Sequence, residues 1–335
     1  MKKKNLLLMI LVLAMVVSSL AGCSKNNSEN TTSTKNNSIV TALTAPMGSG
    51  WHAFTVLLSD IYMDLVPGLN FNVLEGGSIG NIKAISGGVD ANFGWAYTTD
   101  LRDAYKGEGA FTEVYSDALP IAVTYPVWLN VLTLDNGKIT SIAQLKDARI
   151  NVGAVGTGSE LAAKRMLEAY GFTYDSIKTN GGQISYGSYS DGSTQLSDGI
   201  VEAIMGGGSP NIPAYSEVSQ QNKCLLLPVS EEAANNLLAK DYGYTISEIP
   251  ANTYVNQLDP VSAVTYQSVL IVNKDMNEEL VYQLVKGLWE SMDRIRKEQP
   301  ARGNLMSIDT ALEGINVEDL HPGAAKYYKE VGLIK

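Results

Sequence analysis

The alternation of short apolar runs with helical patterns constrains the fold of this chain most. The apolar run 39–43 is followed by apolar residues at helical spacing from Phe54 to Leu65, and Pro67-Gly68 ends that helix. The same pattern recurs along the chain and predicts strands at 39–43, 71–74, 90–95, 121–123, 128–134, 150–155, 201–205, 225–229 and 264–272. A long amphipathic helix is expected at 278–297. This alternation predicts parallel sheets covered by helices.

The repeated unit predicts two α/β lobes. We expect an α/β fold in which two doubly wound sheets are joined by crossing hinge strands, as in hinged binding proteins. Residues 39–125 would form lobe one and residues 126–264 lobe two. Residues 265–335, with a returning strand and the long helix, would pack back on lobe one.

Three turns from a strand to a helix are rich in glycine and small hydroxyl residues. They are Gly48-Ser49-Gly50, Gly76-Gly77-Ser78 and Gly156-Thr157-Gly158-Ser159. At the carboxyl ends of parallel strands, glycine lets the backbone approach a ligand, and free helix N–H groups attract anions. Each turn alone is equally explained by a tight connection that needs a positive φ. Their matching positions on both lobes predict that a carboxylate or similar oxyanion binds between them.

Aromatic residues fall at or just after the same strand ends. They are Trp51, Trp95, Tyr97, Tyr125 and Trp128. Such side chains either pack in the core or enclose the apolar part of a small ligand and exclude water when a cleft closes. The segment containing Gly207, from Gly206 to Pro210, also follows a strand and is either a pocket wall or a turn near the hinge.

Catalytic motifs are missing from the sequence. His52 and His321 are the only histidines, and no Cys/His cluster has the spacing of a metal site. No glycine-rich turn is followed by the Lys-Ser/Thr pair of a nucleotide-binding loop, and the turn at 156–160 does not match a nucleophile elbow. We therefore expect a protein that is not an enzyme and that uses no cofactor and no metal. His321 is expected to be structural.

The amino-terminal segment predicts export and lipidation. A basic head at Lys2 to Lys4 precedes an apolar run at 6–17, and Leu20-Ala21-Gly22-Cys23 has the pattern of a bacterial lipobox. Residues 1–22 would be a signal peptide, and Cys23 would carry the lipid that anchors the protein to the outer face of the cytoplasmic membrane. Residues 23–38 would form a flexible polar tether.

The charge of the chain disfavours nucleic acid and anionic lipid as partners. Removal of residues 1–22 takes away three of the 25 basic residues and none of the 35 acidic ones, so the net charge changes from −10 to −13. With Cys23 lipidated, Cys224 is the only other cysteine and no intramolecular disulfide is possible. Cys224 opens an apolar run and is expected to be a structural thiol in a buried strand.

Several short motifs and one C-terminal string of residues together suggest a family. The motifs include Gly48-Ser49-Gly50, the segment 76–81, the segment 107–111, Tyr125-Pro126 and the segment 152–159, and the string Leu-His-Pro-Gly-Ala-Ala-Lys-Tyr-Tyr-Lys-Glu spans 320–330. Over about residues 39–335 the chain resembles the TAXI family, the solute receptors of tripartite ATP-independent periplasmic (TRAP) transporters.

The resemblance implies a two-lobed type II periplasmic-binding-protein fold with a ligand in the cleft between the lobes. It implies delivery of a small carboxylate or amino acid, such as glutamate, glutamine or 2-oxoglutarate, to a permease driven by an ion gradient. Matched by position, the residues expected to face the ligand are Ser49, Gly50, Gly77, Ser78 and Asn81 on lobe one and Thr157, Gly158 and Ser159 on lobe two. We expect a monomer.

Three alternatives remain open from the sequence. The chain could be the substrate-binding lipoprotein of an ABC importer, which differs in its permease. It could also be a surface lipoprotein enzyme, which would show turnover, or an adhesin, which would bind macromolecules without closing two lobes.

Overall fold

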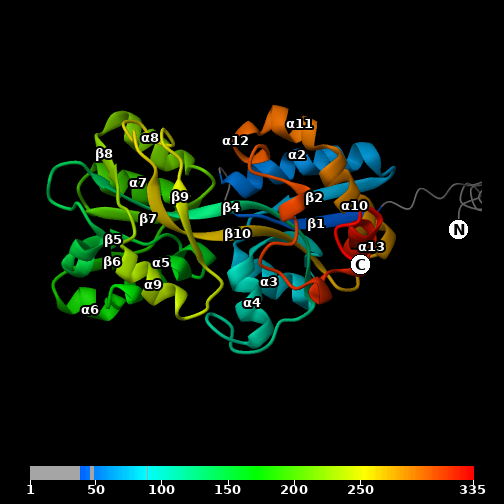
Figure 1. The fold of residues 1–335 in the computed structure, drawn as a ribbon, viewed down its shortest axis with the longest axis horizontal. Helices are drawn as coiled ribbons and strands as arrows, with labels where there is room; N and C mark the ends of the chain where they lie inside the picture. The colour runs from blue at the N-terminus through cyan, green and yellow to red at the C-terminus, as the bar shows by residue number, and fades with distance from the viewer. Residues whose placement is uncertain (1–37, 46–48, 89) are drawn as a thin grey trace, which may run out of the picture. The chain divides into compact units, whose positions relative to one another are not determined.

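Two long antiparallel strands, β4 (Ala118–Leu134) and β10 (Val261–Asn273), run side by side through the middle of a ten-stranded sheet (Figure 1). This computed structural model describes residues 38–45, 49–88 and 90–335. The strand order is β2-β1-β3-β10-β4-β7-β5-β6, with β8 paired to β4 and β9 paired to β10. Because β4 and β10 take part in both halves, the sheet is continuous.

The first lobe contains the parallel strands β1 (Ser38–Leu43), β2 (Leu69–Leu74) and β3 (Phe93–Tyr97). Its connecting helices are α2 (Gly50–Leu65), α3 (Ser78–Gly87) and α4 (Thr98–Lys106). The C-terminal elements pack on this lobe as well; they are α10 (Glu278–Glu290), α11 (Met292–Glu298), α12 (Pro300–Gly303), the 3₁₀ turns η2 (Ile308–Thr310) and η3 (Val317–Asp319), and α13 (Pro322–Glu330).

The second lobe is built around the parallel strands β5 (Arg149–Asn151), β6 (Gln183–Ser185) and β7 (Ala203–Gly208). Two short strands, β8 (Cys224–Leu226) and β9 (Thr245–Ile249), extend it. Its helices are η1 (Ile142–Asp147), α5 (Gly158–Ala169), α6 (Tyr174–Thr179), α7 (Tyr189–Ser197), α8 (Pro213–Gln221) and α9 (Glu231–Leu238).

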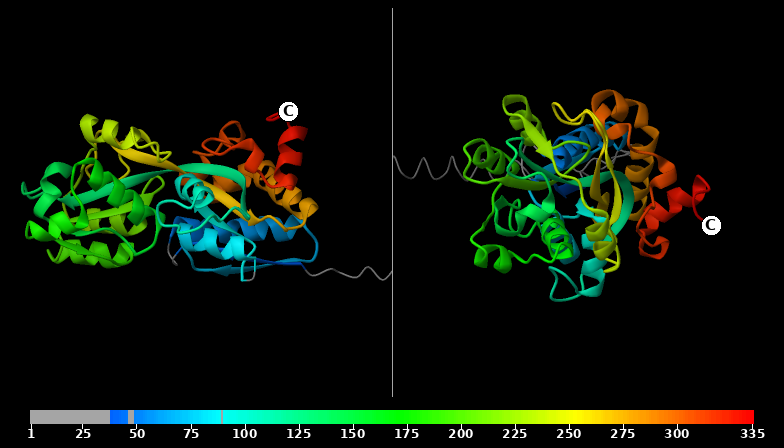
Figure 2. Two further views of the ribbon diagram at one scale, coloured as in Figure 1. Left: turned by 90° about the horizontal axis from the view of Figure 1, so that it is seen from below. Right: turned by 60° about the vertical axis from the view of Figure 1, so that its left-hand side comes forward.

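Helices cover both faces of the sheet in the first lobe (Figure 2). Alternate residues of a strand point to opposite faces. In β10, Leu270 and Val272 join the apolar cluster that includes α2 and α10, whereas Val269 and Ile271 join the cluster of α3 and α4. The central strand is therefore apolar on both faces, which explains its unbroken apolar run.

The C-terminal segment is fixed to the first lobe by buried polar contacts. The Tyr328 hydroxyl donates to the carbonyl of Ile121 at 2.9 Å and accepts from Trp289 Nε1 at 3.1 Å. His321 is 1% exposed, and its Nδ1 accepts from the backbone N–H of Gly323 at the start of α13. His321 thus caps a helix, which agrees with the structural role expected from the sequence.

Four sequence-based expectations need correction. The strand expected at 90–95 is Phe93–Tyr97, and the helix expected at 278–297 breaks at Ser291 into α10 and α11. The two expected sheets are one, because β4 and β10 belong to both halves. The strands expected at 121–123 and 128–134 are also one strand.

Pro126 is tolerated inside β4 because it lies opposite Gln267 at the end of a regular stretch of pairing with β10. The ladder with β10 is irregular between Gln267 and Val269, and pairing with β7 begins only at Trp128. Among the described residues, no helix has the length and apolar character that a membrane crossing requires.

Candidate functional site

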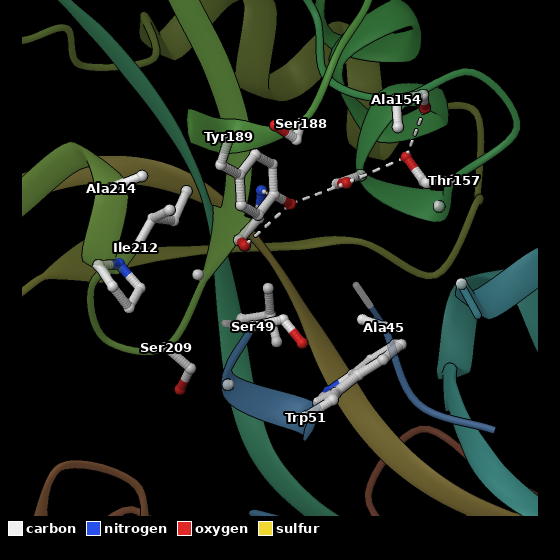
Figure 3. Close-up of a pocket in the computed structure, with 18 of the residues that line it drawn as sticks. Ala45, Ser49, Trp51, Ala154, Thr157, Ser188, Tyr189, Ser209, Ile212 and Ala214 are labelled. Carbon is white, nitrogen blue, oxygen red and sulfur yellow. Dashed lines mark hydrogen bonds between the residues drawn. The ribbon is translucent and has the colours of Figure 1, made fainter. Parts of the chain in front are cut away.

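A cavity of about 270 Å³ lies between the two lobes, at the carboxyl ends of the parallel strands (Figure 3). The first lobe contributes the turns after β1 and β2 and the end of β3. The second lobe contributes the turns that follow β5, β6 and β7. Eleven of the thirteen residues predicted to bind a ligand line this cavity: Ser49, Gly50, Trp51, Gly77, Ser78, Tyr97, Tyr125, Thr157, Gly158, Ser159 and Gly207.

The turn after β1 starts helix α2 at the cavity. Ser49 is the N-cap residue, and its Oγ accepts from the backbone N–H of His52 at 3.2 Å. Trp51 follows in the first turn and is held in place by its indole Nε1, which donates to Ser268 Oγ at 2.5 Å. Its ring lies 4.6 Å from the Tyr97 ring, between centroids. These contacts make Trp51 a fixed aromatic wall of the cavity.

The turn after β2 starts helix α3, whose N-cap residue Gly77 has no side chain to satisfy the helix N–H groups. Ser78 is 1% exposed, and its Oγ accepts from the backbone N–H of Tyr97 at 2.9 Å. A Cβ placed on Gly77 would lie 3.5 Å from Thr157 Cγ2 of the second lobe. The two turns therefore approach each other across the cavity.

The turn after β5 starts helix α5. Thr157 Oγ1 accepts from the backbone N–H of Glu160 at 3.3 Å and donates to the Ala154 carbonyl at 2.9 Å. Ser159 Oγ lies 3.0 Å from the Tyr189 hydroxyl, which also accepts from the backbone N–H of Gly207 at 3.1 Å. Tyr189 thus ties together three turns of the second lobe (Figure 3).

Two predicted site residues, Asn81 and Trp95, lie behind the cavity wall. The Asn81 amide nitrogen donates to the carbonyls of Thr44 and Trp95 at 2.8 Å each, and its oxygen accepts from Gly77 N–H at 3.0 Å. Asn81 therefore supports the turn that lines the cavity.

Trp95 is fully buried in the middle of β3, and its Nε1 donates to Thr55 Oγ1 at 2.7 Å. It stacks on the back of Trp51, with 5.7 Å between ring centroids. Trp128, also expected at a strand end, donates to Ser247 Oγ at 2.9 Å and does not line the cavity either.

The structure adds lining residues that the sequence did not indicate. The turn after β6 contributes Gly187, Ser188, Tyr189 and Ser190, the segment around the start of α8 contributes Asn211 and Glu217 among others, and α12 contributes Arg302. Gly208 and Ser209 also line the cavity, so the segment 206–210 is a pocket wall, one of the two alternatives that the sequence left open. Gly187-Ser188 has the same glycine and hydroxyl pattern as the three turns that were recognised, so that signal was available. Nothing in the local sequence marks Arg302.

Three buried hydroxyl groups at the cavity have no hydrogen-bond partner among the described residues. They belong to Tyr125, Ser209 and Tyr266. Tyr125 and Ser209 line the cavity and are 2% and 4% exposed, and a Cβ on the lining residue Gly207 would collide with the Tyr266 hydroxyl. A buried hydroxyl without a partner loses stabilising interactions, so these groups are available to bind a polar ligand.

The lobes also meet next to the cavity, through Asp100 of α4. Gly158 at the start of α5 has no Cβ; one placed there would lie 2.6 Å from Tyr97 Cδ2 and 2.8 Å from Asp100 Cγ. Asp100 is fully buried, and neither of its oxygens makes a hydrogen bond of standard geometry within the described chain. Burial raises the Asp100 pKa to about 7; nearby Asp103 adds to this, whereas Ser78 and Arg165 oppose it.

Cys224, the predicted structural thiol, is the first residue of β8 and is half-buried. Burial raises its pKa to about 11, so it is a poor nucleophile at neutral pH. No group of three His, Cys, Asp or Glu side chains within the described ranges is arranged to hold a metal ion.

Comparison with known proteins identifies the family. Residues 42–332 match the NMT1-like family, so the chain belongs to that family. A periplasmic transporter structure is similar with a TM-score of 0.54 and 11% identity, over 87% of this chain and 94% of that one.

Two further solved structures are similar. One concerns glutathione import in Gram-positive bacteria through GshT and the cystine ABC importer TcyBC of Streptococcus mutans (TM-score 0.52, 11% identity, 81% of this chain and 98% of that one). The other is the alkanesulfonate-binding protein SsuA from Xanthomonas axonopodis pv. citri bound to MOPS (TM-score 0.51, 14% identity, 86% and 82%). At these identities the similarity establishes the fold, which is that of type II periplasmic binding proteins, as the family resemblance implied.

Proposed function

We propose that this protein is an extracytoplasmic solute receptor that binds a small carboxylate or amino acid between its lobes and delivers it to a membrane permease. The observation that carries this proposal is the cavity between the lobes, lined by the N-termini of α2, α3 and α5 and by buried hydroxyl groups without partners. Helix N-termini and hydroxyl donors together favour an anionic group.

The size of the cavity supports a small solute. Its volume of about 270 Å³ is just below the usual range of small-molecule pockets, roughly 300–1,000 Å³. Glutamate, glutamine and 2-oxoglutarate are of suitable size and carry the acidic group that the helix N-termini favour. Trp51 and Tyr97 would pack against the carbon chain of such a solute.

Binding through closure is supported by the contacts between the lobes. Arg165 of α5 pairs with Asp103 of α4, and Arg102 of α4 pairs with Asp241, which follows α9. Both pairs would separate if the lobes rotated apart about β4 and β10. The closed form would keep water from the ligand and strengthen its polar contacts.

A more specific part of the proposal is the type of transporter that receives the solute. The motifs that resemble the TAXI family favour a TRAP permease driven by an ion gradient. The similar structure from Streptococcus mutans concerns an ABC importer. That similarity favours the alternative, in which this protein is the substrate-binding lipoprotein of an ABC system. Uptake assays with each type of permease coexpressed would separate the two.

The lipid anchor at Cys23 also stays a proposal, because residues 1–37 lie outside the described residues. The signal peptide (1–22), the tether (23–38) and a monomeric state are part of the same proposal.

Mass spectrometry under native conditions tests the receptor function. Purified protein should carry a small acid or amino acid, which denaturation should release for identification, and titration of stripped protein should show one binding site. Turnover of the released compound would instead favour an enzyme. Absence of any bound solute, together with no binding of glutamate, glutamine or 2-oxoglutarate, would contradict the proposal.

A further inference from the structure

Arg302 enters the cavity from α12, more than two hundred residues along the chain from the first-lobe turns. Of the residues that the structure describes, two charged ones line the cavity, and the other, Glu217 on α8, is exposed. Arg302 is half-buried, and its guanidinium lies against the first turn of α2. A Cβ placed on Gly50 would lie 2.6 Å from Arg302 Nε and 2.7 Å from Cζ.

This position places a positive charge at the positive end of a helix. The N-terminus of α2 carries partial positive charge from its unpaired N–H groups, and its first turn contains no acidic residue. A guanidinium at that place is unfavourable unless an anion compensates both features.

The described part of the protein supplies no such anion. Arg302 takes part in none of the ion pairs found among the described residues, and its hydrogen bond to Gln299 is a long one, from Nη1 to Oε1 at 3.4 Å. Its neighbours differ, since Arg294 pairs with Asp64 and Glu298 and Arg296 pairs with Asp293. The chain has 35 acidic residues against 25 basic ones, so carboxylates are plentiful, yet none of those described pairs with Arg302.

A second, independent group points to the same place. The Tyr125 hydroxyl is buried, lines the cavity and makes no hydrogen bond of standard geometry within the described residues. Burial raises the pKa of Tyr125, and the positive charge of Arg302 and polar contacts with Ser268 and Arg302 partly offset this, so the hydroxyl lies close to both side chains. The hydroxyl can donate to an anion that also contacts the guanidinium.

We propose that Arg302, the first N–H groups of α2 and the Tyr125 hydroxyl form the subsite for the acidic group of the solute, and that Arg302 selects for an anion. This inference rests on the proposed receptor function. The subsite leaves the rest of the solute facing Trp51 and the hydroxyl groups of the second lobe. The planar guanidinium can donate two parallel hydrogen bonds to a carboxylate, which a lysine cannot.

The test compares Arg302→Gln and Arg302→Lys with the unaltered protein and with Arg296→Gln. The control removes the same charge from the neighbouring helix α11, where the side chain is 45% exposed and away from the cavity. Each protein is stripped by unfolding and refolding and titrated by calorimetry with L-glutamate, L-glutamine and 2-oxoglutarate, and with the compound released by denaturation.

We expect Arg302→Gln to weaken binding by about tenfold to more than a hundredfold, as for loss of a hydrogen bond to a charged group. Arg302→Lys should fall between the two, and Arg296→Gln should bind like the unaltered protein. The midpoint of thermal unfolding of ligand-free Arg302→Gln should not fall, because the substitution removes a repulsion from the N-terminus of α2.

Equal affinity of Arg302→Gln and the unaltered protein would overturn the subsite while leaving the receptor function intact. A large loss of thermal stability in ligand-free Arg302→Gln would also overturn it, since that result indicates a structural arginine. If the unaltered protein binds none of these compounds and releases none, the receptor function fails and the subsite fails with it.

Discussion

Arg165 Nη2 of the second lobe lies 2.5 Å from Asp103 Oδ2 of the first lobe, with side chains that are 6% and 4% exposed. The Arg165 guanidinium also lies 4.0 Å from the centre of the Tyr242 ring. Removing one partner of an ion pair this deeply buried is costly, because the remaining charge is then buried without either water or a partner. In the closed form this pair therefore joins the lobes firmly.

The Asp103→Asn substitution tests that role. We expect ligand affinity to fall by about tenfold or more, because the closed form is left with an unpaired buried guanidinium. Asp241→Asn is the control, since Asp241 is 87% exposed in its pair with Arg102 and an exposed pair contributes about 0–1 kcal/mol. Equal affinities of the two variants in calorimetric titration would show that the buried pair does not hold the lobes together.

Asp100 predicts a pH dependence of stability. Its pKa is about 7 in the folded protein against an ordinary value of 3.8, so the folded form binds more protons than the unfolded chain between these values. The contribution of Asp100 to the free energy of unfolding should therefore be largest at low pH. It should decrease as pH rises to about 7, by on the order of 4 kcal/mol, because the carboxyl is fully buried.

Asp100→Asn should remove that decline, because an amide does not ionise. The measurement is the midpoint of thermal unfolding from pH 5 to pH 8 for both proteins. The control is Asp293→Asn, the same substitution at a fully exposed side chain, which should keep the decline of the unaltered protein. A decline of equal slope in Asp100→Asn would assign the pH dependence to other groups.

Gly50 is expected to matter because it lacks a side chain. In Gly50→Ala the new methyl group would occupy the position of the Arg302 guanidinium and push it out of the cavity, so solute affinity should fall while the fold is kept. Gly80→Ala is the matched control, since nothing lies within 4 Å of a Cβ there and alanine is favoured over glycine in a helix by up to about 1 kcal/mol. Titration should show weaker binding for Gly50→Ala alone; unchanged binding would contradict the placement of the guanidinium.

The amount that the sequence could predict differs from one part of the cavity to another. The turns at Ser49, Gly77 and Thr157 were found because glycine and small hydroxyl residues at strand ends form a local pattern. Trp95 matched the same pattern and lies on the same face of β3 as Tyr97, two residues earlier. It does not reach the cavity because Trp51 stacks over it, and only tertiary packing decides that contact.

Arg302 could not be found in this way. It reaches Gly50 only through the packing of the C-terminal segment on the first lobe, and such a long-range contact leaves no local signal. The two-lobed α/β fold was predicted because it depends on periodicity, whereas the single continuous sheet depends on the pairing of β4 with β10 across the chain.

The lipid anchor is tested by Cys23→Ser. A hydroxyl cannot replace the thiol in forming the thioether, so the variant should leave the membrane fraction when cells are fractionated. Cys224→Ser is the control and should stay with the membrane. Membrane association of Cys23→Ser equal to that of the unaltered protein would refute the lipobox.

Closure of the lobes on a solute is the central claim, and small-angle X-ray scattering measures it most directly. Protein stripped of ligand by unfolding and refolding should have a larger radius of gyration than the same protein saturated with the solute identified by mass spectrometry, because the lobes move as nearly rigid bodies about β4 and β10. A radius of gyration that does not change at saturating solute would contradict the hinged-receptor account.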